Sequence, residues 1–364
     1  MRLIFVHPNL TERGGAERKM LLIIAELRRR GHDVRLLVNR FAPETTFREL
    51  LPEGFSPTVL SGCKLVWCMR VLAYLLRKPA EVTVAHNHPA QVLVGLFGLL
   101  HPGALCAWIC NEVIPLLAPR NGLAWKAFYS LDKALVRRFD RCIVNSGFTA
   151  ESFRSWYGGE PERIYSGVQL YEEIASASVD DAPWISGLPE RFIFVLSRLE
   201  HHKNLSFLET MARALPDVPI VVAGRGHDQD YVANLARRTP SVTYLGGVSQ
   251  LHKFYLYRRA AVFAFLPTAE PLGVTTMEAI GAGTPVVAFN SGGPREVIRD
   301  GRNGSLCETE DAYITALRRW LEVGAGTTYR EEDFGGYIRE NFSNAVMVRR
   351  FVDRILKLGT CRIA

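Results

Sequence analysis

Residues 191–224 read RFIFVLSRLEHHKNLSFLETMARALPDVPIVVAG, which is a buried strand, a polar loop, an amphipathic helix and a second buried strand. Apolar residues recur at three- and four-residue spacing over 205–215, and this spacing predicts the helix. The runs 191–195 and 219–223 are short and rich in β-branched and aromatic residues, as strands are. This order predicts a parallel βαβ unit.

The beginning of the chain repeats this order. A strand is predicted at 2–6, a helix over 16–30 and a second strand at 34–38, with Gly14 and Gly15 in the loop. Further strands are predicted at 82–86, 104–110 and 141–144 in the first half and at 242–245, 261–265 and 285–288 in the second. The sequence therefore predicts two doubly wound α/β domains with parallel sheets.

The domain boundaries are predicted from the local composition of the sequence. We predict a first Rossmann-like domain over 1–170 and a second over 191–342. The linker 171–190 contains the small, polar and acidic run EEIASASVDDAPW, which is typical of a connection between domains. The last segment, 343–364, carries a helical pattern, and the sequence leaves open whether that helix returns to the N-terminal domain.

Charge and cysteine content limit the class of protein. Lysine and arginine number 44 against 37 acidic residues, and the net charge of +7 favours phosphates, nucleic acid or an anionic membrane as partner. Because the chain has no basic stripe interleaved with aromatic residues, we do not expect nucleic acid. The seven cysteines include no C-x-x-C pair, so we expect free thiols, a reducing cytosol and no zinc site. The first residues do not resemble a signal peptide.

Two apolar segments test the expectation of a cytoplasmic protein. Residues 82–111 contain no charged side chain, but His86, His88 and Pro89 interrupt them, so we predict strand, buried helix and strand rather than a membrane span of about 20 residues. The segment 64–78 is apolar with basic ends. We interpret it as a helix packed on the core, with peripheral docking on a membrane surface as the alternative.

Candidate ligand-binding residues follow the strands of the second half. Arg198 and Lys203 lie in the loop after the first strand, and two cations at the carboxyl end of a strand suit a diphosphate. Gly224 follows the next strand and permits close approach of the backbone to a ligand.

The stretch EPLGVTTMEA, residues 270–279, places one carboxylate on each side of a predicted helix start. The free N–H groups after Gly273 favour a phosphate. Glu278 is predicted on the ligand side of that helix, where it can accept hydrogen bonds from both hydroxyls of a ribose, and Glu270 can bind the hydroxyls of a second sugar. The prediction is a diphosphate held between two sugars.

These motifs resemble family 4 of the retaining glycosyltransferases that use nucleotide sugars. The shared motifs, in the order of the family, are GGAER (14–18), VNSGFTAESF (144–153), IYSGV (164–168), SRLEHHKN (197–204), LGGVSQLHKFY (245–255), the E-x7-E pair followed by GAGTPVV (281–287), and SGGPREVIRDGRNG (291–304). The resemblance extends along nearly the whole chain.

The resemblance implies a GT-B fold with the acceptor on the N-terminal domain and the nucleotide sugar on the C-terminal one. It implies a catalytic set made of Arg198, Lys203, Glu270, Asn111 and His86. The implied donor-binding residues are Gly14, Gly15, Arg198, Lys203, Gly224, Gly246, Val248, Leu251, Glu270, Leu272, Gly273, Val274 and Glu278. In this family the cations take the part of a metal, so neither metal nor other cofactor is expected, and the leaving diphosphate helps to deprotonate the acceptor.

The sequence departs from the family pattern at one place. The family often carries a histidine near the sugar, where this chain reads WICNEV, with Asn111 and then Glu112. Asparagine can donate a hydrogen bond but cannot titrate. Three alternatives stay open: Asn111 substitutes, His86 or His88 supplies the ring, or Glu112 participates.

The predicted activity is that of a retaining, mannosyltransferase-like hexosyltransferase. It would move a sugar from a UDP- or GDP-sugar to a glycan or lipid-linked saccharide during synthesis of a cell-surface polysaccharide or glycolipid. The alternatives are another GT-B enzyme, such as a nucleotide-sugar epimerase, and a non-catalytic nucleotide-binding module.

Overall fold

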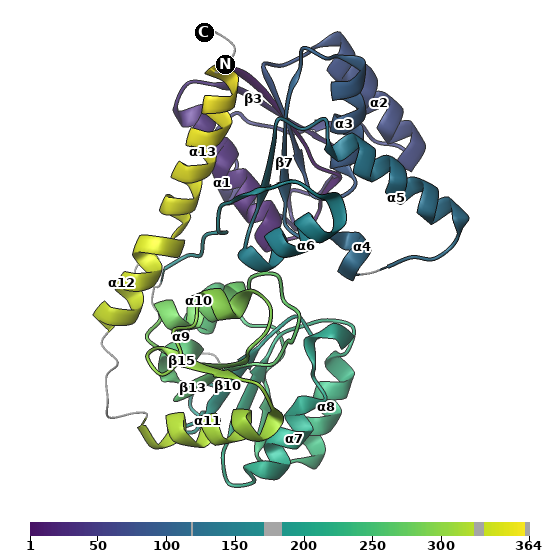
Figure 1. The fold of residues 1–364 in the computed structure, drawn as a ribbon. Helices are drawn as coiled ribbons and strands as arrows, with labels where there is room; N and C mark the ends of the chain where they lie inside the picture. Colours follow the sequence, from purple (N-terminus) through teal and green to yellow (C-terminus); the bar gives the residue numbers. More distant parts are fainter. Residues whose placement is uncertain (118, 171–183, 324–330, 361–364) are drawn as a thin grey trace. The chain divides into compact units, whose positions relative to one another are not determined.

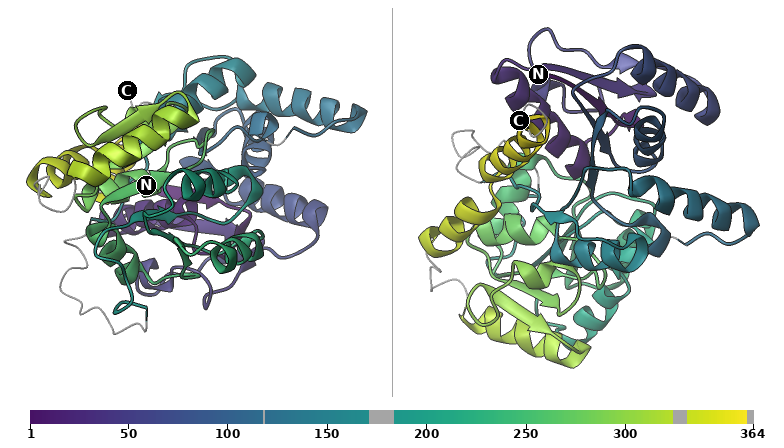
Figure 2. Two further views of the ribbon diagram at one scale, coloured as in Figure 1. Left: turned by 90° about the horizontal axis from the view of Figure 1, so that it is seen from below. Right: turned by 45° about the horizontal axis from the view of Figure 1, so that its top comes forward.

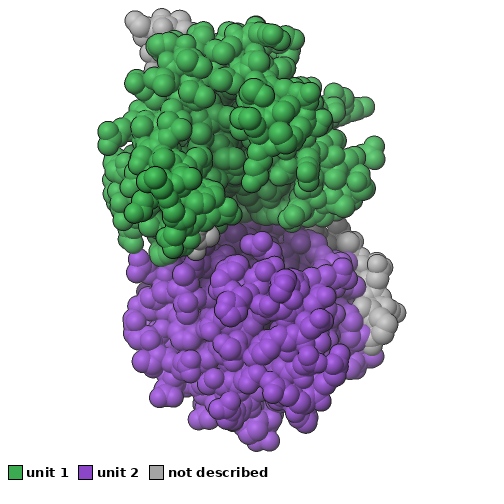
Figure 3. Space-filling view, turned by 90° about the vertical axis from the view of Figure 1, so that its right-hand side faces the viewer, with its two compact units in different colours: residues 1–167, 344–364 green, residues 168–343 purple. Residues whose placement is uncertain are grey.

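A computed structural model describes residues 1–117, 119–170, 184–323 and 331–360 of the 364-residue chain. It contains two compact units, coloured separately in Figure 3. Unit 1 comprises Met1–Gly167 and Asn344–Ala364, and unit 2 comprises Val168–Ser343. Residues 171–183, the larger part of the predicted linker, lie outside the described residues.

Unit 1 is built on a parallel sheet in the order β5-β3-β1-β6-β7-β8-β9. The strands are β1 (Arg2–Val6), β3 (Asp33–Val38), β5 (Thr58–Val59), β6 (Val82–His86), β7 (Leu105–Cys110), β8 (Arg141–Val144) and β9 (Glu162–Arg163). A separate short pair joins β2 (Asn9–Leu10) to β4 (Arg40–Phe41). The central strands are buried on both faces, which explains their continuous apolar runs.

Helices cover both faces of this sheet (Figure 1). One face carries α1 (Gly15–Arg29) and α13 (Asn344–Thr360), with η1 (Arg48–Leu50) beside α1. The other face carries α2 (Lys64–Arg77), α3 (Ala90–Leu100), α5 (Leu123–Val136) and α6 (Gly147–Tyr157). The short helix α4 (Ile114–Leu117) lies between β7 and α5 in the chain. Helix α5 projects away from the sheet in each view of Figures 1 and 2.

The C-terminal helix α13 belongs to unit 1 because its apolar side chains complete the core there. Phe351, Val352 and Ile355 are buried, and they lie in one cluster with residues of α1 and of the sheet. Burial of each such side chain is worth about 1.5–3 kcal/mol.

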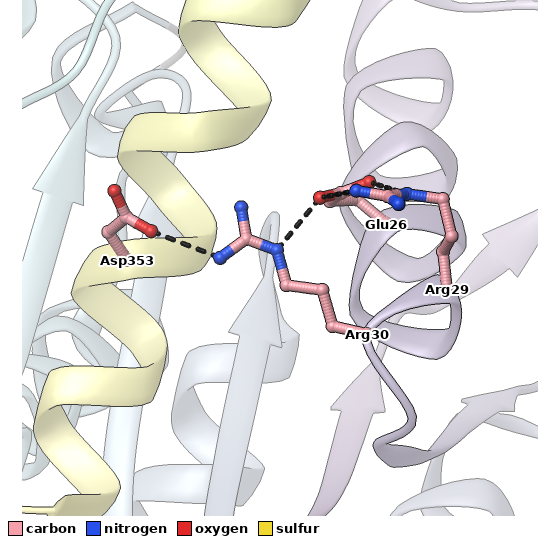
Figure 4. A network of polar contacts seen from close by, with 4 residues as sticks. All are labelled: Glu26, Arg29, Arg30 and Asp353. Carbon is pink, nitrogen blue, oxygen red and sulfur yellow. Dashed lines mark hydrogen bonds and ion pairs between the residues drawn. The ribbon is translucent and has the colours of Figure 1, made fainter.

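A polar network joins the same two helices at the surface (Figure 4). Arg30 donates to Glu26 of α1 at 2.8 Å and to Asp353 of α13 at 3.2 Å. The hydrogen bonds from Arg29 and Arg30 lower the pKa of Glu26 to about 2. Because an exposed ion pair contributes only about 0–1 kcal/mol, the apolar face and not this network attaches α13.

Unit 2 contains a second parallel sheet, ordered β12-β11-β10-β13-β14-β15. Its strands are β10 (Ile193–Leu196), β11 (Ile220–Ala223), β12 (Val242–Tyr244), β13 (Val262–Phe265), β14 (Val286–Phe289) and β15 (Gly304–Cys307). Its helices are η3 (His201–Lys203), α7 (Phe207–Ala214), α8 (Gln229–Arg238), α9 (Gln250–Arg259), α10 (Val274–Gly281), η4 (Gly293–Glu296), α11 (Glu310–Val323) and α12 (Glu331–Phe342). Helices α7, α8 and α11 share a core cluster with the sheet, and α9 and α12 pack on α10.

The predicted fold class, α/β with two doubly wound parallel sheets, is confirmed. The charge-free segment 82–111 forms β6, α3 and β7 as expected. None of the helices in the described part of the chain combines the length and apolar character needed to cross a membrane. Strand β15 was not predicted, because its four residues GSLC carry only a weak strand pattern.

Helix α2 packs on the core, as expected, but through one face only. Trp67, Val71 and Leu75 form its buried face. Leu65 and Met69 are 69% and 55% exposed, so a second apolar face of the helix is open to solvent.

Candidate functional site

Both sheets have a switch point, the place where the chain reverses its direction of winding. In unit 1 the chain winds from β1 to β3 and β5 and then crosses to β6, and in unit 2 it winds from β10 to β11 and β12 and then crosses to β13. Ligands of open α/β sheets bind beyond the carboxyl ends of the strands at such a point. Ligands are therefore expected at the loops after β1 and β6 in unit 1 and at those after β10 and β13 in unit 2.

The loops after β10 and β11 are joined through their backbones. The Leu199 N–H donates to the Arg225 carbonyl at 3.0 Å. Gly224 has φ +140°, and a Cβ atom there would lie 1.9 Å from the Ser197 oxygen. Only glycine fits this position. The joined loops leave the Arg198 side chain exposed to solvent.

Lys203 and Glu270 meet across the switch point of unit 2. Lys203 as a residue is 6% exposed, and its Nζ atom lies 2.5 Å from Oε2 of Glu270. The Glu270 side chain is 26% exposed. An ammonium group has three donor hydrogens, so Lys203 can hold Glu270 and also donate to a ligand oxygen.

The SGG part of the motif at 291–304 packs against the loop that carries Glu270. A Cβ atom on Gly292, which has φ +67°, would lie 2.5 Å from the Glu270 carbonyl oxygen, and one on Gly293 would lie 2.3 Å from Leu272 Cα. The Gly293 N–H donates to that same carbonyl at 2.8 Å. The two glycines thus fix the position of Glu270 by close backbone contact. Leu272 itself is buried.

Helix α10 begins as predicted. Its cap residue, Gly273, has φ +76°, and Val274 is the first helical residue. The Thr276 N–H of this first turn donates to the Gly273 carbonyl at 3.0 Å. The N–H groups that precede it are at the open end of the helix, which is suitable for an anion.

Glu278, which is predicted to bind a ribose, is a buried residue of α10. It is 7% exposed. Lys253 Nζ lies 2.6 Å from its Oε1, and the Tyr257 hydroxyl donates to its Oε2 at 3.3 Å. Neither partner was predicted from the sequence, although their i, i+4 spacing on α9 places them on one face.

The implied donor-binding residues of the motif 245–255 lie beside the glycine loop after β11. The Gly224 N–H donates to the Gly246 carbonyl at 2.8 Å, and Gly246 has φ +71°. Val248 and Leu251 are half-buried at the start of α9. The structure thus gathers the predicted donor residues of the second half along one edge of the unit 2 sheet.

The candidates of unit 1 lie at the carboxyl ends of β1, β6 and β7. His86 is fully buried, and its Nδ1 lies 3.1 Å from Nδ1 of His7. Burial lowers the pKa of His86 well below its usual value. Asn111 Nδ2 lies 3.5 Å from His86 Nε2 and donates to Asn87 Oδ1 at 2.5 Å.

His88 points into a different network, and Glu112 is exposed. Nδ1 of His88 lies 2.5 Å from Gln91 Nε2, which also contacts Asp132. The Tyr157 hydroxyl donates to the same Asp132 at 2.7 Å. Of the four residues left open at the place of the family histidine, the structure brings together only Asn111 and His86.

The glycine loop before α1 folds around an acid. A Cβ atom on Gly14 would lie 2.0 Å from Glu17 Oε2, whereas one on Gly15 would meet no atom within 4 Å. Glu17 Oε1 lies 3.4 Å from His7 Nε2. The loop therefore connects to the buried histidines.

Lys19 was not predicted as a site residue from the sequence. It is 3% exposed, donates to Asn111 Oδ1 and lies 3.3 Å from Ser166 Oγ. Burial lowers its pKa to about 7, although the nearby Cys110 and Glu17 act in the opposite direction. Its position on the apolar face of α1 was the available signal, since a lysine there needs a partner.

Within the described residues, no group of three or more histidine, cysteine, aspartate or glutamate side chains is arranged to hold a metal ion.

Two doubly wound parallel units in one chain define the class of protein, a GT-B fold. The solved structure of HepE from Anabaena in complex with UDP matches it with a TM-score of 0.78 at 19% sequence identity, covering 98% of this chain and 100% of that one. A complex of the same protein with UDP-glucose gives 0.77. At this identity the likeness shows the fold.

The family follows from two models that match consecutive parts of the chain. "Glycosyltransferase Family 4" matches residues 13–171, and "Glycosyl transferases group 1" matches residues 180–339. Human alpha-1,3/1,6-mannosyltransferase ALG2 is 25% identical over 368 residues, 88% of this chain and 87% of that protein. The D-inositol 3-phosphate glycosyltransferase of Mycobacterium tuberculosis is 28% identical over 358 residues, 88% and 73% of the two chains.

The chain belongs to the group 1 glycosyltransferases of family 4 type. The predicted resemblance is confirmed, and so is the predicted enzyme class, a glycosyltransferase of the hexosyltransferase type.

Proposed function

We propose that this enzyme transfers a hexose, with retention of configuration, from a UDP- or GDP-sugar to a glycan or lipid-linked saccharide of the cell surface. The observation that carries the proposal is the Lys203–Glu270 pair at the switch point of unit 2, 2.5 Å between Nζ and Oε2. It supplies a cation for a diphosphate and an acid for a sugar at one place. ALG2, a mannosyltransferase, and HepE, which binds UDP and UDP-glucose, support a hexose and a nucleotide donor.

The proposed donor diphosphate lies between the exposed Arg198 and the start of α10. Arg198 offers a planar fork of donors and Lys203 a compact charge, so the two can neutralise the charge that develops on the leaving diphosphate. In this proposal the two side chains take the part that a metal has in other transferases.

The transferred sugar binds next to the diphosphate. Because Lys203 contacts Glu270 directly, a phosphate bound to the lysine and a sugar bound to the glutamate are neighbours. The backbone around Gly273 and Val274 can come close to that sugar, since Gly273 has no side chain.

Glu278 is proposed to bind the ribose in spite of its burial. Each of its carboxylate oxygens has more than one acceptor position, and Lys253 and Tyr257 occupy one position on each. These two partners also fix the orientation of the carboxylate, which lowers the entropy lost on binding.

Unit 1 is proposed to hold the acceptor and to rest on an anionic membrane. Residues 64–138 contain nine lysines and arginines and three acids, so they carry 9 − 3 = +6 of the net charge of +7. Among the described residues, the large apolar side chains that are exposed all lie in unit 1: Val59, Leu65, Met69, Leu76, Leu99, Leu100, Leu116, Leu123 and Leu131.

These side chains belong mostly to one layer of helices. Helix α3 packs against both α2 and α5, and the three helices cover the same face of the sheet (Figure 1). Basic and apolar groups on one layer suit adhesion to anionic lipid at about 1 kcal/mol per well-placed charge. A lipid-linked acceptor made at the cytoplasmic face of a membrane fits this surface.

The test begins with a panel of nucleotide sugars, scored by release of UDP or GDP. We expect the enzyme to consume one of these donors. Calorimetry should show that the Lys203→Met variant binds the nucleotide of that donor about 10- to 100-fold more weakly, since a hydrogen bond to a charged group is lost. Lys357→Gln, at an exposed position of α13, is the control and should bind normally.

Two results would contradict the proposal. An epimerase would convert the nucleotide sugar without releasing the nucleotide. A non-catalytic module would bind UDP or GDP without turnover of any donor.

A further inference from the structure

A continuous chain of polar side chains crosses the carboxyl edge of the unit 1 sheet. It runs from Lys19 on α1 through Asn111 after β7, His86 at the end of β6 and His7 after β1, and it ends at Glu17 on α1. The contacts after Asn111 measure 3.5 Å from Asn111 Nδ2 to His86 Nε2, 3.1 Å between the two Nδ1 atoms, and 3.4 Å from His7 Nε2 to Glu17 Oε1.

One assignment of hydrogen atoms satisfies the side-chain contacts from Lys19 to His7; it leaves out the 3.4 Å contact of His7 Nδ1 with the His86 carbonyl, and the 3.4 Å approach of His7 Nε2 to Glu17 is an ion-pair distance rather than a hydrogen bond. Lys19 donates to Asn111 Oδ1, and the Asn111 amide donates to Nε2 of His86. His86 then carries its proton on Nδ1 and donates to Nδ1 of His7, which leaves the Nε2–H of His7 directed at Glu17. The burial that keeps His86 neutral is required for this arrangement.

The arrangement determines what Asn111 can offer to a ligand. One N–H of its amide contacts Asn87 Oδ1 at 2.5 Å, and the other is directed to His86. Lys19 uses one of the two lone pairs on Oδ1. The remaining lone pair is an acceptor on a side chain that is not fully buried. Asn111 is therefore prepared to accept a hydrogen bond rather than to donate one.

Lys19 is costly to retain in this position. Its amine is fully enclosed, its hydrogen-bond partners Asn111 and Ser166 are neutral, and the ring of Phe351 lies 5.3 Å from Nζ. Its pKa of about 7 reflects the cost of a buried charge. A buried ionisable group with a strongly shifted pKa is more often found at a functional site than elsewhere.

We propose that Lys19 is a positioning residue for the transfer reaction, holding the Asn111 amide so that the free lone pair of Oδ1 accepts a hydrogen bond from a hydroxyl group of the bound saccharide. This inference rests on the proposed function. It assigns Asn111 the place of the histidine common in the family, and Lys19 the task of fixing its orientation.

The positioning depends on pH because the neutral amine fits the enclosed space and the ammonium does not. The titratable or polar groups that face Lys19 are Glu17 on its own helix, Cys110 and Asn111 at the end of β7, His86 on β6 and Ser166 after β9. None of these contacts supplies a carboxylate within hydrogen-bond distance of Nζ. Protonation below about pH 7 therefore favours local opening, which loosens Asn111.

The experiment compares three full-length variants by transfer to a saccharide acceptor between pH 5.5 and 9. Lys19→Met should lower kcat/KM for the acceptor about three- to tenfold, the value of one neutral hydrogen bond. Lys19→Gln keeps a neutral donor and should retain most of the activity, without the fall of the wild type below about pH 7. Lys357→Gln should match the wild type at each pH.

Two further measurements separate the possible failures. UDP and GDP affinities should be unchanged in Lys19→Met, because Arg198, Lys203 and Glu278, which are proposed to hold the nucleotide, lie in unit 2. A loss of nucleotide affinity as large as the loss in kcat/KM would overturn the inference. If the wild type binds no nucleotide at all, the proposed function is wrong, and the positioning itself is then judged by NMR of the Asn111 side-chain amide. The role of Lys19 is refuted if Lys19→Met leaves the Asn111 amide resonance unchanged. It is also refuted if that variant keeps the kcat/KM and the pH profile of the wild type.

Discussion

The switch points of the two units have the same topology and opposite chemistry. In unit 2 the contact across the switch point joins Lys203 and Glu270, a charged pair whose acid is a quarter exposed. In unit 1 it joins His7 and His86, which are both buried, and burial keeps His86 neutral. A doubly wound sheet thus brings two loops together in either case, and the side chains alone decide which ligand is suited to the place.

The two buried lysines extend this contrast. Lys203 has a carboxylate partner, whereas the hydrogen-bond partners of Lys19 are an amide and a hydroxyl. A cation with a paired acid can exchange that partner for a phosphate without leaving a buried charge unpaired. A lysine with neutral partners is suited to orient a neutral group such as Asn111. The following predictions test this difference between a charged site in unit 2 and a neutral one in unit 1.

Glu278→Ala in unit 2 should have the largest effect on stability. It leaves the Lys253 amine without its acid in a site where that side chain is 13% exposed, and such a loss costs about 3–5 kcal/mol. Chemical denaturation measures this change. Calorimetry should show that nucleotide binding weakens by about 1.5–3 kcal/mol as well.

The double variant Glu278→Ala with Lys253→Met separates the two effects. Removing the unpaired amine should restore most of the stability but none of the nucleotide affinity. Recovery of both would show that Glu278 serves the fold of unit 2 alone.

Lys19→Met in unit 1 should change how stability depends on pH. The pKa of Lys19 falls from 10.5 in the unfolded chain to about 7 in the fold, so between these values the unfolded state binds more protons and the wild type gains stability as pH rises. Relative to Lys19→Met, its free energy of unfolding should rise by about 1.4 kcal/mol per pH unit in this window and stay constant below pH 7. Parallel curves from pH 7 to 10 would mean that the amine is not buried neutral.

Glycine substitutions compare the loops of the two units. Gly224→Ala should destabilise by about 2–3 kcal/mol, because φ is +140° and the added Cβ meets the Ser197 oxygen. Gly15→Ala has open space in the first turn of α1 and should be neutral or stabilising by up to about 1 kcal/mol. Thermal unfolding of the two variants measures these changes in stability. Equal losses of stability in both variants would contradict the difference in loop packing.

The smallest expected change in stability is at the exposed face of α2. A double variant, Leu65→Gln with Met69→Gln, should alter the free energy of unfolding by no more than about 0.5 kcal/mol, since both side chains are exposed. It should reduce sedimentation with phosphatidylglycerol vesicles, whereas Arg213→Gln on α7 of unit 2 should not. Unchanged sedimentation would remove α2 from the proposed membrane surface.

The sequence by itself determined the fold class and the family. Short apolar runs alternating with amphipathic helices at 2–38 and 191–224 require parallel βαβ units, because no other arrangement buries both faces of such strands. Gly224 was readable as a position of close backbone approach, and the cations and acids after the strands as groups for a ligand. These features are local in the chain, so a sequence pattern can carry them.

Only the tertiary structure decided which partners these groups have. Glu278 and Lys253 are 25 residues apart, Lys203 and Glu270 are 67 apart, and Lys19 and Asn111 are 92 apart. The sequence did not reveal the partners of Glu278, because helical periodicity gives the direction of a side chain but not what packs against it. It missed Lys19 for the same physical reason, since the burial that shifts a pKa is produced by strands and helices that meet only when the sheet has formed.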